Sequence, residues 1–213
     1  MTTSEYHRDG YAFVAGIIPR EVANGMLARL KQDLAGQGVT MEGLQTQGPL
    51  LRQPASELYG HHYPMFVFFH WGLTSRMEEL VGEPLLPTYC YFRLYREGDI
   101  CRVHGDRVAC EHSLSLTLDY SDGVPWPLEV ARTRTDTPFA RADEGFAAGE
   151  DSAAVSMEPG DAVLYQGVHH HHGRTTPNPN GWSAHLFLHW VARNGPYAAS
   201  AFDGQPPPAH VDF

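Results

Sequence analysis

The sequence predicts a mainly β protein in which two helices pack on an antiparallel β-sandwich or barrel. Three observations predict this fold class. Apolar residues recur at helical spacing only before Pro87. After Pro87, side-chain types alternate with a period of two residues, as in strands. Of the 213 residues, 42% are hydrophobic. A chain of this length and composition can bury an ordinary globular core, so we expect one domain.

The first 86 residues are expected to supply a helical support. Segment 9–18, DGYAFVAGII, has the composition of a short apolar strand, and Pro19 then opens a helix over 20–34. Residues 36–64 are rich in Gly and Gln and predict irregular structure. A second helix is expected over 65–81, and its front, MFVFFHW, is apolar on all sides, which predicts that it is buried. The predicted buried stripes are Val22, Met26, Leu27, Leu30 and Leu34 in the first helix, and Leu73, Met77, Leu80 and Val81 in the second.

The segments after Pro87 have the alternation typical of strands with two different faces. Segment 88–99 places Tyr89, Tyr91, Arg93 and Tyr95 on one face. Segment 113–120 places Leu114, Leu116 and Leu118 on one face, and Ser113, Ser115 and Thr117 on the other, where they line a pocket or meet solvent. Further strands are expected at 126–130, 161–167 and 184–191. Residues 132–154 predict a long loop, either floppy or a lid, and residues 203–213 a flexible tail.

Charge and cysteine content exclude several classes of protein. The formal net charge is −10, from 25 acidic and 15 basic residues, which argues against a nucleic-acid partner. The sequence has no apolar run long enough to span a membrane and no signal pattern at its N-terminus. The three cysteines, Cys90, Cys101 and Cys110, lack metal-binding spacing and are expected to be reduced thiols in a cytoplasmic protein.

Histidines carry the strongest chemical signal. His104-Gly105-Asp106 places an imidazole and a carboxylate two residues apart, so both side chains point the same way at the end of a strand. A second histidine from a distant strand would complete a 2-His-1-carboxylate set, which occupies one face of an octahedral Fe(II) ion. The four consecutive histidines at 169–172 could supply it, and they lie too far from either terminus for a purification tag. An H-x-D sequence alone occurs by chance in many proteins.

The surrounding residues resemble a known family. Tyr95, Gly98, His104 and Asp106 fit the pattern Y-x-x-G-x-x-x-x-x-H-x-D, which is similar to the prolyl-4-hydroxylase-like branch of the Fe(II)/2-oxoglutarate dioxygenases. RDGYAFVAGIIPREV resembles the N-terminal entry of these enzymes and of their phytanoyl-hydroxylase-like relatives. CEHSLSLTLDY resembles the strand after their H-x-D, and MEPGDAVLYQG the turn and strand before their second histidine. The resemblance covers most of residues 7–195.

The resemblance implies a double-stranded β-helix, a jelly-roll and cupin-like core. It implies one domain, with an N-terminal helical support at 1–86 and the core at 87–195. It also implies Fe(II) as metal, 2-oxoglutarate as co-substrate and O2 as oxidant. Among the four consecutive histidines, His172 best matches the distal metal ligand, beside His104 and Asp106, while His169, His170 and His171 are interpreted as a polar strand end.

The co-substrate carboxylate needs a cation, because burying an unpaired carboxylate is very costly. The family usually supplies a Lys or Arg about ten residues after the distal histidine, but here that region reads PNPNGWSAHLFL and contains neither. Two candidates remain: Arg93, slightly favoured by its strand neighbours, and Arg174. Tyr95 matches the family tyrosine that hydrogen-bonds 2-oxoglutarate, and His185 and His189 are assigned structural or supporting roles.

The resemblance implies an oxygenase that hydroxylates an unactivated C–H bond of a small molecule, such as an amino acid or a biosynthetic intermediate. A protein or peptide side chain is the alternative substrate. A metal-binding β-barrel without 2-oxoglutarate chemistry is an alternative of a different class, supported by the missing cation, and a structural protein with a surface histidine run is a third. We expect a monomer or homodimer that binds neither nucleic acid nor membrane.

Overall fold

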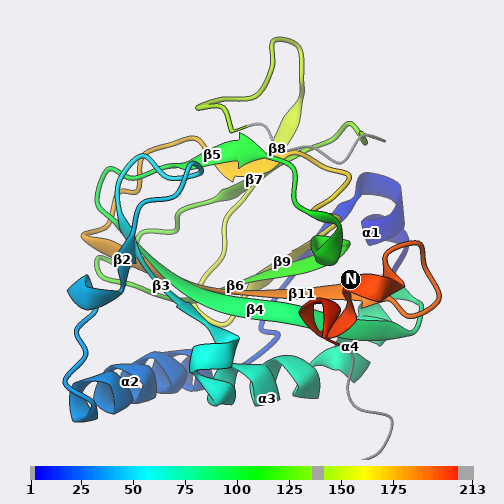
Figure 1. The fold of residues 1–213 in the computed structure, drawn as a ribbon. Helices are drawn as coiled ribbons and strands as arrows, with labels where there is room; N and C mark the ends of the chain where they lie inside the picture. Colours follow the sequence, from blue (N-terminus) through cyan, green and yellow to red (C-terminus); the bar gives the residue numbers. More distant parts are fainter. Residues whose placement is uncertain (1–2, 136–141, 206–213) are drawn as a thin grey trace, which may run out of the picture.

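Two antiparallel sheets face each other, and helices cover the outer side of one of them (Figure 1). The computed structural model describes residues 3–135 and 142–205. The helices are α1 (Thr3–Asp9), α2 (Arg20–Gly36), α3 (Pro64–Gly72) and α4 (Thr74–Val81), with short 3-10 turns η1 (Glu42–Leu44), η2 (Gly60–His62), η3 (Val108–Cys110) and η4 (Ala198–Gly204). The strands are β1 (Tyr11–Val14), β2 (Gln45–Thr46), β3 (Ala55–Tyr59), β4 (Leu85–Arg96), β5 (Cys101–His104), β6 (His112–Tyr120), β7 (Leu128–Ala131), β8 (Ser152–Val155), β9 (Ala162–Tyr165), β10 (His172–Arg174) and β11 (Trp182–Ala192).

The strand order confirms the predicted jelly-roll class. Within the described residues, a seven-stranded sheet runs β1-β9-β6-β11-β4-β3-β2 and a four-stranded sheet runs β5-β10-β7-β8. Strands adjacent in a sheet are mostly distant in sequence, as with β1 beside β9 and β5 beside β10. This non-local antiparallel pairing is typical of the double-stranded β-helix.

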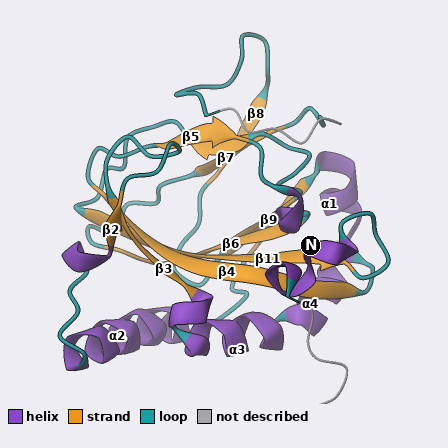
Figure 2. Ribbon diagram, in the orientation of Figure 1, coloured by secondary structure: helices purple, strands orange, loops and turns teal. Residues whose placement is uncertain are grey.

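The helices bury their apolar stripes against the outer face of the large sheet (Figure 2). Period-two alternation turns Leu114, Leu116 and Leu118 of β6 toward this side, where they join one hydrophobic cluster with Leu30 and Leu34 of α2. The predicted first helix is confirmed. Its stripe is wrong at Val22, which is 45% exposed, while Ala23 is fully buried one residue further on.

The second predicted helix is two helices, because the chain breaks between α3 and α4 at Leu73. Gly72, a weak helix former, ends α3, and the amide of Leu73 donates to the carbonyls of both Phe69 and His70. The expectation that the MFVFFHW front is buried is also wrong. Phe66 and His70 face β4 and β11 and are buried, but Phe68 is 71% exposed because α3 has no covering element on its outer side within the described residues.

The strands expected after Pro87 are confirmed with small changes at their ends, whereas the region before Pro87 was under-predicted. The strand expected over 9–18 is limited to β1, and the irregular segment 36–64 contains β2 and β3. Sequence patterns also missed α1 and β8, and they gave no bounds for the strands expected beside His104 and His172, which are β5 and β10.

The remaining expectations concern segments that are partly described. Residues 136–141 of the predicted loop and 206–213 of the predicted tail lie outside the described residues. Asp203 and Gly204, assigned to the tail, belong to η4, and Asp203 pairs with Arg107 at 2.9 Å. The three cysteines are buried free thiols. None of the described helices is both long and apolar enough to cross a membrane.

Candidate metal centre and co-substrate pocket

The three predicted metal ligands converge on the inner side of the small sheet. His104 ends β5, Asp106 follows two residues later, and His172 begins β10. Antiparallel pairing of these strands places His104 and His172 opposite each other. Nε2 of His104 lies 3.5 Å from Oδ1 of Asp106, and Nε2 of His172 lies 3.5 Å from Oδ2. The ring of His172 also meets that of Tyr165 in the large sheet at 4.6 Å, so the group lies between the sheets.

Both imidazoles are oriented by backbone carbonyls. Nδ1 of His104 lies 2.7 Å from the carbonyl oxygen of Arg102, and Nδ1 of His172 lies 2.9 Å from that of His170. A carbonyl only accepts hydrogen bonds, so each Nδ1 carries a proton, and Nε2 is the nitrogen that holds the lone pair when the ring is neutral. Burial, followed by the nearby His172, lowers the pKa of His104. Each ring therefore directs its Nε2 toward Asp106.

Asp106 is held by a close backbone approach that only glycine permits. Its amide donates to the carbonyl of Gly167 at 2.8 Å. A Cβ on Gly167 would lie 2.2 Å from Oδ2 of Asp106 and 2.9 Å from the carbonyl of Cys110. Burial alone would raise the pKa of Asp106, but its contacts with the imidazoles of His172 and His104 outweigh burial and hold the pKa well below its usual value.

This donor set fits an octahedral divalent metal. The ligand atoms of His104, Asp106 and His172 all lie within 4.8 Å of one another. Neighbouring ligands of a metal at about 2.1 Å are about 3 Å apart, close to the 3.5 Å separations here. Two imidazoles and one carboxylate on one face are the set typical of non-haem Fe(II), and they leave the opposite face for exogenous ligands.

The other three histidines of the quartet lie in the turn before β10, so the prediction that they form a strand end is wrong. Nδ1 of His169 bonds the carbonyl of Thr135, Nδ1 of His170 that of Ala131, and Nδ1 of His171 the carboxylate of Glu150. These contacts draw each ring toward a neighbouring segment. They fix the turn that delivers His172.

Arg174 lies inside the barrel, and no acidic side chain of the described residues pairs with it. Its side chain is 1% exposed, its guanidinium stacks over Trp126 at 5.1 Å, and Nη2 lies 3.4 Å from Nδ1 of His185. Nε of Arg174 and Nε2 of His185 are buried, and neither finds a hydrogen-bond partner among residues 3–135 and 142–205. Burial and then the charge of Arg174 lower the pKa of His185 well below its usual value, so His185 is neutral. A buried guanidinium with an unused N–H donor is stabilised by an anion that accepts this hydrogen bond and balances the charge.

Arg93, the other predicted cation, already has a carboxylate partner. It pairs with Glu57 of β3 at 2.8 Å, and the two side chains are only 8% and 10% exposed. Its Nη1 donates to the hydroxyl of Tyr95 at 3.1 Å, and the ring of Tyr95 packs edge-on against Trp126. Glu57 was missed because it lies in the segment predicted to be irregular, where no periodicity marks its strand.

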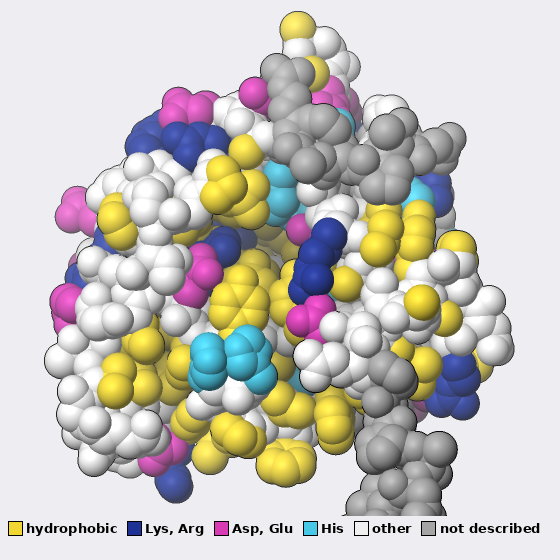
Figure 3. All heavy atoms as spheres, in the orientation of Figure 1, with side chains coloured by type: hydrophobic (Ala, Val, Ile, Leu, Met, Phe, Trp, Pro, Cys, Tyr) yellow, Lys and Arg dark blue, Asp and Glu magenta, His cyan; other side chains and the backbone are white. Residues whose placement is uncertain are grey.

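The polar face of β6 lines the space between the sheets. Ser113, Ser115 and Thr117 are fully buried, so of the two expected environments they line the pocket and do not meet solvent. Oγ of Ser113 lies 2.8 Å from Nδ1 of His189, and Oγ1 of Thr117 lies 3.3 Å from Nδ1 of His185. Figure 3 shows that this side of the molecule is hollowed between the two sheets.

A second group of metal-ligating atoms shares Asp106. Asp106, Cys110 and His189 bring one ligand atom each within 4.8 Å of one another. Sequence reasoning did not connect Cys110 with this site, because its place in η3 depends on a turn that no motif marks. Burial and the charge of Asp106 raise the pKa of the Cys110 thiol well above its usual value, which disfavours the thiolate that binds metals.

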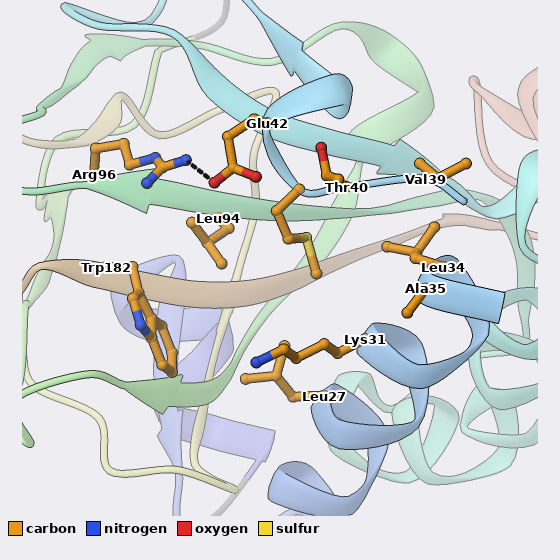
Figure 4. A pocket seen from close by; sticks show the side chains of 11 residues that line it. Leu27, Lys31, Leu34, Ala35, Val39, Thr40, Glu42, Leu94, Arg96 and Trp182 are labelled. Carbon is orange, nitrogen blue, oxygen red and sulfur yellow. Dashed lines mark hydrogen bonds and ion pairs between the residues drawn. The ribbon is translucent and has the colours of Figure 1, made fainter. Parts of the chain in front are cut away.

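A separate cavity of about 430 Å³ lies outside the barrel, between α2 and the large sheet (Figure 4). Apolar side chains such as Leu27, Leu94 and Trp182 line it, and Arg96 and Glu42 pair at its rim at 2.9 Å. It contains no His or Cys among its lining residues. The chemistry-bearing residues therefore gather inside the barrel and not in this cavity.

The comparisons with known proteins find solved structures of similar fold but no match by sequence. No protein-family model matches the chain, and no curated protein matches it. Its structure matches that of the non-heme alpha ketoglutarate dependent epimerase SnoN from nogalamycin biosynthesis, with a TM-score of 0.65 and 14% identity over 99% of this chain and 90% of the other. Alpha ketoglutarate and 2-oxoglutarate are the same compound.

The chain has the fold of the alpha ketoglutarate dependent enzymes. HygX from Streptomyces hygroscopicus, solved with nickel, 2-oxoglutarate and hygromycin B, matches with a TM-score of 0.64 and 13% identity over 90% of this chain and 86% of that one. A Pseudomonas putida prolyl-4-hydroxylase matches with a TM-score of 0.59 and 15% identity over 91% and 98%. The fold implied by the sequence resemblance is thus confirmed, while the site residues rest on their own geometry.

Proposed function

We propose that the protein is a non-haem Fe(II)/2-oxoglutarate-dependent oxygenase that holds its metal through His104, Asp106 and His172. The observation that carries the proposal is the convergence of two imidazole Nε2 atoms on one carboxylate, at 3.5 Å each. Iron held by these three residues would supply activation of O2 for oxidation of an unactivated C–H bond. The chain positions the ligands through the carbonyls of Arg102 and His170 and keeps the centre between two sheets, away from bulk water.

Arg174 is the proposed anchor for the far carboxylate of 2-oxoglutarate. Its guanidinium is buried, has no carboxylate partner among the described residues and leaves Nε unused. A carboxylate received there would gain two parallel, charge-assisted hydrogen bonds. Arg174 also shares the short strand β10 with His172, so one element would set both the metal and the anchor. Arg93 is the weaker candidate, because Glu57 already balances it.

Other residues around Arg174 would shape the same pocket. The hydroxyl of Tyr95 accepts from Arg93, which leaves its own proton for an incoming oxygen atom. His185 is neutral, so its contact with Arg174 through Nδ1 leaves the charge of the guanidinium unbalanced. Because Arg174 offers a cation, the argument for a metal-binding barrel without 2-oxoglutarate chemistry loses its support.

The proposed reaction is hydroxylation of a small molecule. The solved structure of HygX contains hygromycin B, which supports a small-molecule substrate in this fold. SnoN is named an epimerase, so the same fold hosts other outcomes, and a protein side chain is the second candidate because the prolyl-4-hydroxylase also shares the fold. We further propose that residues 1–86 and 87–195 act as one domain, since β3 pairs with β4 across that boundary.

The test is an anaerobic titration of metal-stripped protein with Fe(II) and then 2-oxoglutarate, followed by the visible charge-transfer band of the chelate. We expect the band in the wild type and no band in His172→Ala. Arg174→Ala should weaken 2-oxoglutarate binding roughly 30-fold or more, because it leaves a desolvated carboxylate unpaired. Arg29→Ala, at an exposed pair with Asp33, is the matched control and should leave the titration unchanged.

Two results would contradict the proposal. Stoichiometric Fe(II) binding without any band would exclude 2-oxoglutarate as co-substrate and restore the metal-binding barrel. If 2-oxoglutarate no longer produces the band in Arg93→Ala but still produces it in Arg174→Ala, the carboxylate anchor is Arg93 and not Arg174.

A further inference from the structure

An aromatic wall runs from the metal centre toward the surface along the inner face of the large sheet. It consists of Tyr59 of β3, Tyr89 and Tyr91 of β4, and Phe187 and His189 of β11. The rings of Tyr89 and Tyr91 are nearly parallel, with 11° between their planes, and Tyr91 stacks on Phe187 at 4.8 Å. Tyr59 stacks on Tyr91 at 5.4 Å and is 38% exposed, so the wall reaches solvent.

The inner end of the wall is His189. Its ring lies 4.6 Å from that of Tyr89, and one of its nitrogens belongs to the group of ligand atoms that includes Asp106. The side chain is 2% exposed, and its Nε2 is buried without a hydrogen-bond partner in the described part of the chain. A polar atom left unpaired in this position costs stability, which suggests that a ligand completes it.

The hydrogen bonds around Ser113 allow Nε2 of His189 to act as an acceptor. Nδ1 of His189 lies 2.8 Å from Oγ of Ser113, and that hydroxyl donates to the carbonyl of Cys110 at 3.2 Å. Ser113 has one proton, so while it donates to Cys110 it must accept from Nδ1. Nδ1 then carries the imidazole proton, and Nε2 presents a lone pair to a donor such as a hydroxyl group.

In the described part of the chain, the two cations that lie on the wall are each paired with a carboxylate. Arg93 lies over Tyr91 at 5.1 Å and pairs with Glu57 at 2.8 Å. Arg107 lies over Tyr89 at 4.1 Å and pairs with Asp203 of η4 at 2.9 Å. The hydroxyl of Tyr89 is paired with the thiol of Cys110 at 3.1 Å. Because Arg93 and Arg107 already lie over the rings of Tyr91 and Tyr89, a further cation is disfavoured there, and the aromatic surface suits an uncharged, planar ligand.

We propose that the substrate is a hydroxylated aromatic ring system that stacks on the aromatic wall and donates its hydroxyl proton to Nε2 of His189. The proposal rests on the proposed oxygenase function, because it places the ring beside the metal ligand Asp106. His189 is then the residue that recognises the hydroxyl, while the tyrosines select a planar ring.

The test uses three probes of matched size: 2-naphthol, 2-methoxynaphthalene, which lacks the donor, and decahydro-2-naphthol, which lacks the planar ring. Each is titrated calorimetrically into the anaerobic complex of the full chain with Fe(II) and 2-oxoglutarate. We expect 2-naphthol to bind at least fivefold more tightly than either analogue, as one hydrogen bond or one aromatic contact contributes about 1 kcal/mol.

Variants separate the two contacts. His189→Phe should abolish the preference for 2-naphthol over its methyl ether, and His189→Gln, which keeps an acceptor, should restore part of it. Tyr91→Leu should reduce the preference for 2-naphthol over the saturated alcohol. Retention of the charge-transfer band in each variant shows that the centre remains intact.

Equal affinities for the three probes, no binding of any probe, or an unchanged preference in His189→Phe would each overturn the inference while the band persists. Absence of the band in the wild type is a different result. It would refute the oxygenase function, and the probe series with the metal-free protein would then still decide whether the wall binds hydroxylated rings.

Discussion

The imidazoles of His104 and His172 are prepared for metal binding by backbone carbonyls and not by neighbouring carboxylates. Each Nδ1 donates to a carbonyl two residues earlier in the chain, from Arg102 and His170. This local contact fixes both the tautomer and the ring direction before any metal arrives. His171, by contrast, bonds Glu150 and turns away from the centre. Neighbouring histidines thus have different roles because the Nδ1 atom of each bonds to a different acceptor.

The first prediction concerns Gly167, whose missing side chain makes room for Asp106. In Gly167→Ala the new Cβ would lie 2.2 Å from Oδ2 of Asp106, so the carboxylate must move. We expect metal affinity to fall roughly 10- to 100-fold, as for other residues that orient a metal ligand. Competition with a chromogenic chelator measures the change.

Gly25→Ala is the matched control for this substitution. Gly25 is exposed in α2, and a Cβ there has nothing within 4 Å, so metal affinity should be unchanged. If Gly167→Ala binds metal as tightly as the wild type, Asp106 either tolerates the displacement or is not a ligand.

At the scale of elements, strands with long alternation or a clear apolar run were predictable, and several short strands were not. β6 and β11 each alternate over many residues, so their sequence alone marks both the strand and its two faces. β5 and β10 have four and three residues, and they form because they pair with each other across a large separation in sequence. The H-x-D motif nevertheless predicted the metal-binding end of β5, since the chemistry of His104 and Asp106 is local, whereas His172 in β10 was implied by the family resemblance.

Helix α3 shows why hydrophobicity alone led to a wrong prediction of burial. All of MFVFFHW is apolar or aromatic, so the sequence favours burial on every side. The large sheet covers only one side of α3, and the other side is exposed. Which side is covered depends on tertiary contacts that a uniform apolar segment does not encode.

The second prediction compares two phenylalanines of α3. Phe66 is 1% exposed and packs against Tyr63 and Phe92, whereas Phe68 is 71% exposed. Phe66→Ala should lower the free energy of unfolding by about 3–5 kcal/mol through loss of packing and a new cavity. Phe68→Ala should change it by less than about 0.5 kcal/mol. Urea unfolding of both variants provides the comparison, and a large loss in Phe68→Ala would show that this face is covered in solution.

At the scale of the whole molecule, the large sheet separates two environments. Its outer face carries leucines that pack under the helices, and its inner face carries Ser113, Thr117, His185 and His189 around the centre. The alternation of β6 and β11 predicted this division, because neighbouring residues in a strand point to opposite faces. The choice between Arg93 and Arg174 was not predictable, since it depends on Glu57 from a distant strand.

The third prediction follows from two histidines that fold in their neutral form outside the metal centre. Burial, and then nearby His189, lowers the pKa of His70 to about 3, and burial, followed by His7, lowers that of His112 to about 4. Both pKa values lie below the ordinary value of about 6.5 that these groups regain on unfolding. Between pH 6.5 and pH 4 the unfolded chain therefore binds more protons, so the free energy of unfolding falls as the pH falls.

The expected loss is about 1 kcal/mol for each of these histidines per pH unit below pH 6, and stability should be restored above pH 6.5. Urea unfolding at pH 7.5, 6 and 5 measures it. His70→Gln keeps a donor for the carbonyl of His189, and His112→Asn keeps a partner for the hydroxyl of Tyr6, but neither residue titrates. The double variant should therefore lose less stability between pH 6.5 and pH 5 than the wild type. An equal loss in both proteins would show that His70 and His112 are not the groups that bind protons on unfolding.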